Sequence, residues 1–258
     1  MTNVLVLMVK PLVPYEVITV LIPCRNEAGN VKKIFSAIHS LRDVQEVLLI
    51  EGGSSDGTFE ALQSALELCG DSRIRVLRQT GRGKFNAVLE GAHASKSEHL
   101  AIWDADMTID HNDQNNLIEL YLHAEPANQM KFVTANRLNP QMNDSAMRPL
   151  NKLGNHFFAK ATKNIANIDI PDALAGSKIF PKILLEDEAI CRRAIDLDPF
   201  GDLFLLAQIK KHGLKFLSIN CEYKSRTYGT TNINRWSGGA AMLRFLLHLK
   251  FHRCNKAN

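Results

Sequence analysis

Two carboxylates stand one residue apart in the segment Leu100-Ala-Ile-Trp-Asp104-Ala-Asp106, directly after a short apolar run. Alternate residues of a β-strand point the same way, so Asp104 and Asp106 are expected to project together where a strand ends. Two hard oxygen ligands in that position suit a divalent cation that a phosphate-bearing substrate also holds. Surface turns produce Asp-x-Asp pairs by chance, so the meaning of this pair depends on the elements that position it.

The first half of the chain alternates strand-like and helix-like patterns. Continuous apolar runs predict four strands, at residues 17–22, 44–50, 74–77 and 100–103. Apolar residues at helical spacing predict a helix after each of the first three, at 31–41, 59–66 and 85–92. This alternation favours an α/β fold with a Rossmann-like, mostly parallel sheet covered by helices on both faces. The less regular second half predicts strands at 132–135 and 216–223 and a helix at 150–165.

Polar and acidic segments follow three of the predicted strands. They are Pro23-Cys-Arg-Asn26-Glu27, Glu51-Gly-Gly-Ser-Ser-Asp56-Gly and Asp104-Ala-Asp106. Ligands of parallel sheets bind beyond the carboxyl ends of the strands. These segments are therefore expected to meet at one edge of the sheet and to form the functional site there.

Composition narrows the class of protein. The 258 residues carry a net charge of +4, which is too mild for a nucleic-acid-binding surface. The five cysteines are scattered without C-x-x-C spacing, which predicts reduced thiols rather than disulfides or a zinc site. No apolar run approaches the roughly 20 residues that cross a bilayer, and residues 4–9 lack the flanks of a signal peptide. A cytoplasmic protein, soluble or peripheral at a membrane, is expected.

The segment Gly81-Arg-Gly83-Lys84 has the composition of a phosphate-binding loop. Its backbone N–H groups can contact phosphate oxygens, and Lys84 can neutralise their charge. The segment lacks Walker A spacing, and Asn86 stands where the dinucleotide fingerprint requires its third glycine. A dehydrogenase is therefore disfavoured, and a basic turn before a helix is the competing interpretation.

Taken in order, these segments resemble the family 2 glycosyltransferases of the nucleotide-diphosphosugar transferase fold. The matching segments are 22–27, 51–58, 81–87 and 104–106, and the resemblance covers about residues 17–230. Within that family the chain is most similar to the dolichyl- and polyprenyl-phosphate sugar transferases. Three segments carry this finer likeness: Ala135-Asn-Arg137, Asp172-Ala-Leu-Ala-Gly176-Ser-Lys178 and Arg226-Thr-Tyr-Gly229-Thr-Thr-Asn-Ile233.

The resemblance implies a role for each matching position. Nucleotide-binding residues would be Pro23, Asn26, Glu27, Glu51, Asp56, Gly83, Lys84 and Asp104. Asp104 and Asp106 would hold Mg²⁺ or Mn²⁺ against the donor diphosphate, where the metal assists departure of the nucleoside diphosphate. Asp106 would thus act in catalysis as well as in metal binding. Phosphate of the donor or acceptor would be held by Arg137, Lys178 and Arg226.

Two departures from the family pattern affect the donor site. Glu51 stands where most members carry Asp, which leaves the choice of nucleotide base open. Met107-Thr108 follows the second aspartate where the polyprenyl-phosphate enzymes often carry polar residues, so this departure does not assure a third protein ligand for the metal. Asp110 is the candidate substitute.

Asp202, in Phe200-Gly-Asp202-Leu, matches the acidic acceptor-side motif of the family. A hydroxyl acceptor needs a base to take its proton, and Asp202 is our candidate for that base; a phosphate acceptor is already ionised and needs none. The competing interpretation is a helix N-cap, because the apolar run 203–209 follows directly. Helix capping is also open for Asn26, Glu27 and Asp56.

Three segments are expected along the chain: an N-terminal segment at 1–16, a glycosyltransferase domain at 17–235 and an amphipathic tail at 236–258. In the tail, Arg244, His248 and His252 fall on one helical stripe among apolar residues. Such a helix can lie in a membrane interface, or it can pack on the catalytic domain.

The predicted activity is inverting transfer of a sugar from a nucleotide-diphosphate sugar to a polyprenyl phosphate. The first alternative keeps the donor but uses a sugar hydroxyl acceptor in polysaccharide or surface-glycan synthesis. The second is a non-catalytic module that binds nucleotide sugars. A nucleotidyltransferase is disfavoured because residues 23–30 contain no Gly-rich loop.

Overall fold

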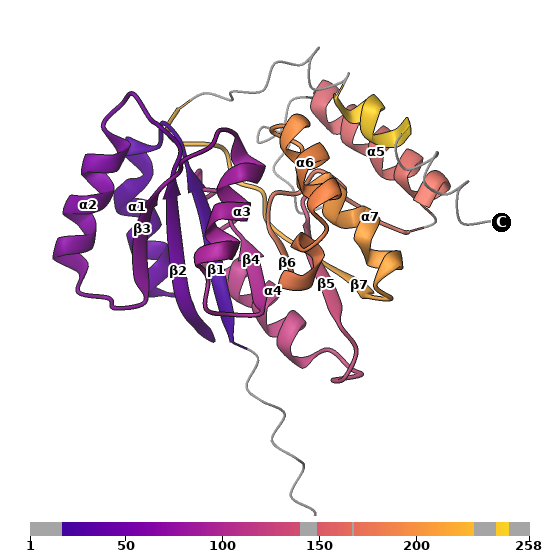
Figure 1. Ribbon diagram of the computed structural model, residues 1–258, viewed down its shortest axis with the longest axis horizontal. Coiled ribbons are helices and arrows are strands. Elements are labelled where there is room, and N and C mark those ends of the chain that lie inside the picture. The colour runs from indigo at the N-terminus through magenta and orange to yellow at the C-terminus, as the bar shows by residue number, and fades with distance from the viewer. Residues whose placement is uncertain (1–16, 140–148, 167, 230–240, 248–258) are drawn as a thin grey trace, which may run out of the picture.

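The structure, a computed structural model, describes residues 17–139, 149–166, 168–229 and 241–247. Its centre is a seven-stranded sheet in the order β3-β2-β1-β4-β6-β5-β7 (Figure 1). The strands are β1 (Ile18–Cys24), β2 (Val44–Glu51), β3 (Ile74–Arg78), β4 (His99–Ile102), β5 (Lys131–Asn136), β6 (Lys178–Pro181) and β7 (Lys215–Asn220). The described residues do not include the expected N-terminal segment (1–16), the last residues of the expected domain (230–235) or most of the expected tail.

Helices cover both faces of this sheet, as the alternation predicts. The helices are α1 (Val31–His39), α2 (Thr58–Cys69), α3 (Lys84–Ala94), α4 (His111–His123), α5 (Pro149–Ala166), α6 (Glu188–Asp196) and α7 (Leu203–Lys211). The core on one face joins α1, α2 and α4 to the sheet, and the core on the other joins α3, α6 and α7. Neighbouring residues of β1 alternate between the two cores: Val20 and Ile22 face one, and Leu21 faces the other.

The mostly parallel sheet is confirmed, with one addition. Strands β1 to β4 pair in parallel, and so do β5 and β7, but β6 runs antiparallel to both of its neighbours. This four-residue strand was not predicted. Because β6 reverses direction, its first residue, Lys178, lies at the same edge as the carboxyl ends of the parallel strands.

Two predicted strand ends are wrong by two or three residues. Strand β1 does not stop before Pro23 but runs to Cys24, with Pro23 opposite Ile50 of β2. The proline stands next to the last residue of the strand, so its missing N–H removes pairing only where the strand ends. Strand β7 ends at Asn220 rather than Tyr223, and the chain then leaves the sheet.

The amino end of the sheet holds a buried carboxylate. Glu46 of β2 is 4% exposed and lies between donors of three other segments. It accepts hydrogen bonds from Thr19 Oγ1 (3.1 Å), Arg75 Nη1 (2.7 Å) and the Lys96 N–H (3.1 Å). Burial raises the pKa of Glu46, but the hydrogen bond from Arg75 and the two others outweigh it, so its pKa lies below the ordinary value.

We expect Glu46→Gln to lower the free energy of unfolding by about 1–3 kcal/mol at neutral pH, because three donors lose a charged acceptor. The stabilisation from a lowered carboxyl pKa is complete above the unfolded-state pKa, about 4.3, and is lost as the pH falls through the folded-state value. Urea unfolding of both proteins measures the difference, which should shrink below about pH 4. A difference independent of pH would contradict this account.

Candidate active site

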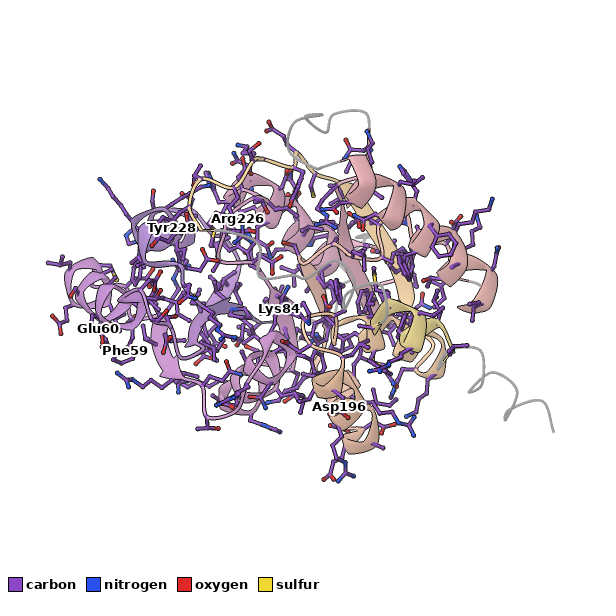
Figure 2. The ribbon with its side chains drawn as sticks, turned by 90° about the horizontal axis from the view of Figure 1, so that it is seen from above. Phe59, Glu60, Lys84, Asp196, Arg226 and Tyr228 are labelled. Carbon is purple, nitrogen blue, oxygen red and sulfur yellow. The ribbon has the colours of Figure 1, made fainter. Side chains whose placement is uncertain are left out.

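The two central carboxylates lie in a tight turn after β4. The Met107 N–H donates to the Asp104 carbonyl at 3.1 Å, and Met107 has a positive φ of 51°. The side chains of Asp104 and Asp106 lie at the carboxyl edge of the sheet, as expected, but each is paired with a different cation. Asp104 Oδ1 is 2.5 Å from Lys84 Nζ, and Asp106 Oδ2 is 2.7 Å from Arg226 Nη2. The two cations come from distant parts of the chain, as Figure 2 shows.

The Lys84–Asp104 pair is charged at neutral pH. Burial would raise the pKa of Asp104, but the charge and hydrogen bond of Lys84 outweigh it and hold the pKa below its usual range. For Lys84, burial works against the ammonium, while the charges of Asp104 and Asp202 raise its pKa above the ordinary value. The carboxylate is thus ionised, as a metal ligand must be.

Gly176 makes room for Asp104. A Cβ atom at Gly176 would lie 1.7 Å from Asp104 Oδ2, so no other residue fits without displacing the carboxylate. Gly176 falls within a segment of the family resemblance, but its contact with Asp104 was not predicted, because the two residues are far apart in sequence.

A segment that we call the C-terminal strap, residues 221–229, crosses the site after β7. Arg226 of the strap contacts Asp106 and also lies 3.6 Å from Glu27 Oε1. Further along, the Tyr228 hydroxyl is 3.2 Å from Asp56 Oδ2, and the Tyr228 ring lies where a Cβ of Gly29 would be. Arg226 and Tyr228 are labelled together in Figure 2. The strap therefore joins the last strand to the loops after β1 and β2.

Direct hydrogen bonds connect the loops that follow β1 and β2. The Asn26 N–H donates to Ser54 Oγ at 2.9 Å, and Asn26 Oδ1 accepts from the Ser55 N–H at 2.9 Å. The Glu27 N–H donates to Thr58 Oγ1 at 2.8 Å. These contacts bring Pro23, Asn26, Glu27, Glu51 and Asp56 to one end of the edge.

Two carboxylates of these loops serve the protein itself. Glu51 Oε1 accepts from the Ser54 N–H at 2.6 Å within its own loop. Burial raises the pKa of Glu27, against the opposing effects of a hydrogen bond from Asn30 and the charge of Arg226. Glu27 is thus held inside the protein, where it accepts a hydrogen bond from the Asn30 side chain and lies beside Arg226.

The expected helix caps are corrected at two positions. The N-cap of α2 is Gly57, with φ 84°, whereas Asp56 Oδ1 accepts from the Thr58 N–H at 3.1 Å from just outside the helix. Glu27 occupies an N-cap position of the short 3₁₀ turn before α1 but makes no side-chain cap hydrogen bond.

Asp110 does not lie with the other carboxylates as a metal ligand. It is the N-cap of α4, accepts from the Asn112 and Asp113 N–H groups at 2.9 and 3.0 Å, and pairs with Lys224 at 2.8 Å. Across the described ranges of the chain, no three His, Cys, Asp or Glu side chains are arranged to hold a metal ion. Asp104 and Asp106 thus stand without a third acidic ligand there.

A buried ion pair forms the far side of the site. Arg137, just after β5, donates from Nε to Asp172 Oδ2 (2.7 Å) and from Nη2 to Asp172 Oδ1 (3.0 Å). The guanidinium also lies 5.1 Å from the Tyr223 ring centre. Burial opposes both charges, but their attraction dominates, so the pKa of Asp172 is lowered and that of Arg137 is raised.

Lys178 and Asp202 form a second buried pair. Lys178 Nζ lies 2.6 Å from Asp202 Oδ2 and also donates to the Ala175 carbonyl. Lys178 is only 1% exposed. Asp202 directly precedes α7, where an N-cap would stand, but its carboxylate contacts Lys178.

The Gly81–Lys84 segment meets a carboxylate that was not predicted. Asp198, between α6 and α7, accepts from the Lys84 N–H at 2.5 Å. Gly83 has φ 91°, and a Cβ there would lie 2.5 Å from Asp198 Cγ. The start of α3, which was expected to contact phosphate, is thus contacted by the Asp198 carboxylate. No local sequence signal could have revealed this contact, because the two residues are 114 positions apart.

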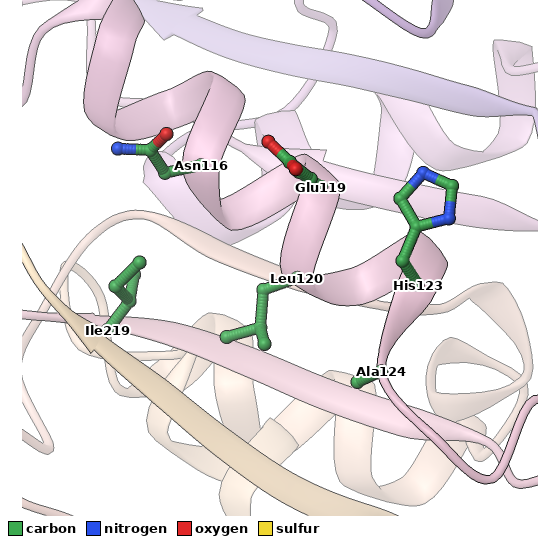
Figure 3. Close-up of a pocket in the computed structure, with 6 residues that line it drawn as sticks. All are labelled: Asn116, Glu119, Leu120, His123, Ala124 and Ile219. Atoms are coloured by element: carbon green, nitrogen blue, oxygen red, sulfur yellow. The ribbon is translucent and has the colours of Figure 1, made fainter.

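A hollow of about 350 Å³ lies elsewhere, between α4 and β7 (Figure 3). It is lined by Asn116, Glu119, Leu120, His123, Ala124 and Ile219. It shares no residue with the site described above.

No described helix is long and apolar enough to cross a membrane.

The sheet order and the loops at its carboxyl edge define the fold of the nucleotide-diphosphosugar transferases. The likeness extends over 94% of the chain to glucosyl-3-phosphoglycerate synthase from Mycobacterium tuberculosis, solved with Mn²⁺, UDP and glucosyl-3-phosphoglycerate. The TM-score is 0.62 at 16% identity, and 81% of that chain is covered. The same synthase with phosphoglyceric acid gives a TM-score of 0.64 at 17% identity, with the same coverage of both chains.

The family is shown by the sequence itself. The model of glycosyl transferase family 2 matches residues 19–187, and the chain belongs to that family. Glycosyltransferase AglJ from Haloferax volcanii is 26% identical over 246 residues, which cover 94% of this chain and 73% of that protein. A poly-beta-1,6-N-acetyl-D-glucosamine synthase from Staphylococcus aureus is 31% identical over 109 residues. That match covers 42% of this chain and only 26% of the synthase.

We expect Asp172→Asn to lower the free energy of unfolding by about 3–5 kcal/mol, because it leaves the buried Arg137 guanidinium without its counter-charge. Denaturant unfolding measures the change. The matched control is Asp169→Asn, which breaks an exposed pair with Lys163 and should leave stability unchanged. Adding Arg137→Leu to Asp172→Asn should recover part of the loss, and a double variant as unstable as the sum of the singles would contradict the pairing.

Proposed function

We propose that the protein is a metal-dependent, inverting glycosyltransferase that moves a sugar from a nucleotide-diphosphate sugar to a polyprenyl phosphate. Use of a nucleotide-sugar donor is supported by one observation: Asp104, Asp106 and the loops after β1 and β2 lie together at one edge of the sheet. Family membership supports the same donor chemistry. The relatives' names do not include a polyprenyl acceptor, so the acceptor half is argued from the site.

A divalent metal fits the central carboxylates. Asp104 and Asp106 lie at the carboxyl edge of the sheet, and each is already paired with a cation of the protein. In the proposed reaction these two would hold Mg²⁺ or Mn²⁺, and the metal would stabilise the departing diphosphate as a Lewis acid. The Mycobacterium tuberculosis synthase of the same fold was solved with Mn²⁺ and UDP, which supports the pairing of a metal with a nucleotide.

Two buried cations favour a phosphate acceptor. Arg137 and Lys178 lie at the same edge as the central carboxylates, and the planar guanidinium suits phosphate. An acceptor phosphate oxygen would attack the anomeric carbon while the bond to the nucleoside diphosphate breaks, and no proton has to be removed. Such an acceptor would require the protein to work at a membrane surface, and we propose that the tail, residues 236–258, takes part in that contact.

A sugar hydroxyl acceptor is the second candidate. The charge of Asp202 contributes to the raised pKa of Lys84, which supports a role for this carboxylate beside the proposed donor residues. As a base, Asp202 would take the hydroxyl proton during attack. Asp202 Oδ2 is held by Lys178, however, so proton transfer to that oxygen requires the ammonium to move.

A donor screen tests the central proposal. We expect Mn²⁺ together with a nucleoside diphosphate to raise the melting temperature, with UDP and GDP as the first probes. Gly176→Ala should abolish that shift, because its Cβ displaces Asp104 Oδ2. The matched control is Gly154→Ala on α5, where a Cβ meets nothing within 4 Å, and it should keep the shift. Absence of stabilisation by every nucleotide would contradict the proposal, and binding without sugar release or transfer would favour a non-catalytic module.

The acceptor class is tested by Asp202→Asn and Lys178→Met in single-turnover transfer assays. A phosphate acceptor predicts that Asp202→Asn keeps most of its activity, while Lys178→Met loses roughly tenfold or more in acceptor affinity. A hydroxyl acceptor with Asp202 as base predicts loss of turnover by roughly 10²–10⁴-fold in Asp202→Asn. Donor binding serves as the control for folding of both variants. Near-complete loss in Asp202→Asn with a lipid-phosphate acceptor would contradict our choice.

A further inference from the structure

Four of the eight large apolar side chains that are exposed in the described part of the chain lie on two helices. Leu153 and Phe157, one turn apart on α5, are 67% and 62% exposed. Leu243 and Leu247, one turn apart on the helical residues 241–247, are 57% and 46% exposed. The two helices run side by side in both views (Figures 1 and 2). We call these four residues the two-helix patch.

Each helix is held on the protein by its opposite side. Phe158 of α5 is 8% exposed, and Phe245 is 1% exposed. The Phe245 ring meets the Phe204 ring of α7 edge to face, with centroids 5.4 Å apart. The tail helix therefore packs on the catalytic domain, as one of the two interpretations expected, and still presents Leu243 and Leu247 outward.

Neither helix of the two-helix patch carries an acidic residue. Helix α5 contains no acidic residue, and the chain has none after Glu222. Lys160 and Arg244 are exposed beside the apolar residues. On α5, Lys163 pairs with Asp169 from outside the helix. Apolar side chains bordered by cations match the interface of an anionic bilayer, where each buried methylene and each nearby cation contributes to binding.

The position of α5 relates this surface to the site. The chain leaves the carboxyl edge of the sheet after Arg137, forms α5, and returns to the edge at Asp172. The two ends of this segment are joined by the bidentate ion pair between Arg137 and Asp172. A surface that binds α5 is therefore anchored to the side of the site where Arg137 and Lys178 lie.

We propose that the two-helix patch docks the protein on an anionic membrane surface, with α5 and the tail helix lying in its plane. The choice of a lipid surface over a protein partner rests on the proposed lipid-phosphate acceptor and on the absence of acidic residues from both helices. The docked protein faces the membrane with the acceptor side of its site, so that a phosphate at the lipid surface reaches Arg137 without leaving the membrane.

The test is co-sedimentation of the full chain with vesicles of phosphatidylcholine alone or mixed with phosphatidylglycerol. We expect binding to the mixed vesicles, weakened by salt. Leu153→Asp combined with Phe157→Asp should reduce it by roughly tenfold or more, since two apolar side chains leave the interface. The matched control is Leu68→Asp on α2, an apolar side chain that is 88% exposed and lies outside the patch, and it should bind as the unaltered protein does.

Charge is tested separately. Lys160→Glu with Arg244→Glu should weaken binding to the mixed vesicles, whereas Lys32→Glu on α1 should not. The proposal is overturned if the unaltered protein stays in the supernatant, if the Leu153/Phe157 variant binds equally well, or if that variant instead dissolves a dimer that does not bind vesicles. Stabilisation by nucleotide is measured in parallel without vesicles, so failure of the donor chemistry and failure of docking are read independently.

Discussion

Carboxylates that converge at one edge of a parallel sheet must be matched by cations, and this electrostatic constraint organises the protein. Four ion pairs meet it: Lys84–Asp104, Arg226–Asp106, Arg137–Asp172 and Lys178–Asp202. In each pair the two partners come from different elements. These ion pairs therefore also determine how α3, the C-terminal strap and strands β5 and β6 are arranged around the site.

The four pairs differ in how they can respond to substrate. Arg137 and Asp172 are buried and bound through two hydrogen bonds, so we expect this pair to stay together while other N–H groups of the guanidinium contact a phosphate. Lys84 and Arg226 are each bound to a carboxylate that the proposed metal would also use. A metal and a diphosphate bring charges of both signs, so these two cations can pass from carboxylate to phosphate with little change in the total charge of the site.

Much of the fold was predictable, because continuous apolar runs mark buried parallel strands without any tertiary information. The acidic loops were predictable for the same reason, since topology places the ends of parallel strands together. What was missed has three different causes. The four-residue β6 is too short to show a pattern, Asp198 reaches the start of α3 from 114 residues away, and Asp110 turned out to be a helix cap.

The C-terminal strap has a consequence for how the protein is made. Asp106 and Glu27 are synthesised early, but Arg226, which contacts both, emerges from the ribosome about 120 residues after Asp106. Until then Asp106 and Glu27 lack the cation that contacts them both in the folded protein. The first strands can form during translation, but these two carboxylates are paired only when the strap has reached them. Maturation of the site therefore has to wait until residue 226 has been synthesised.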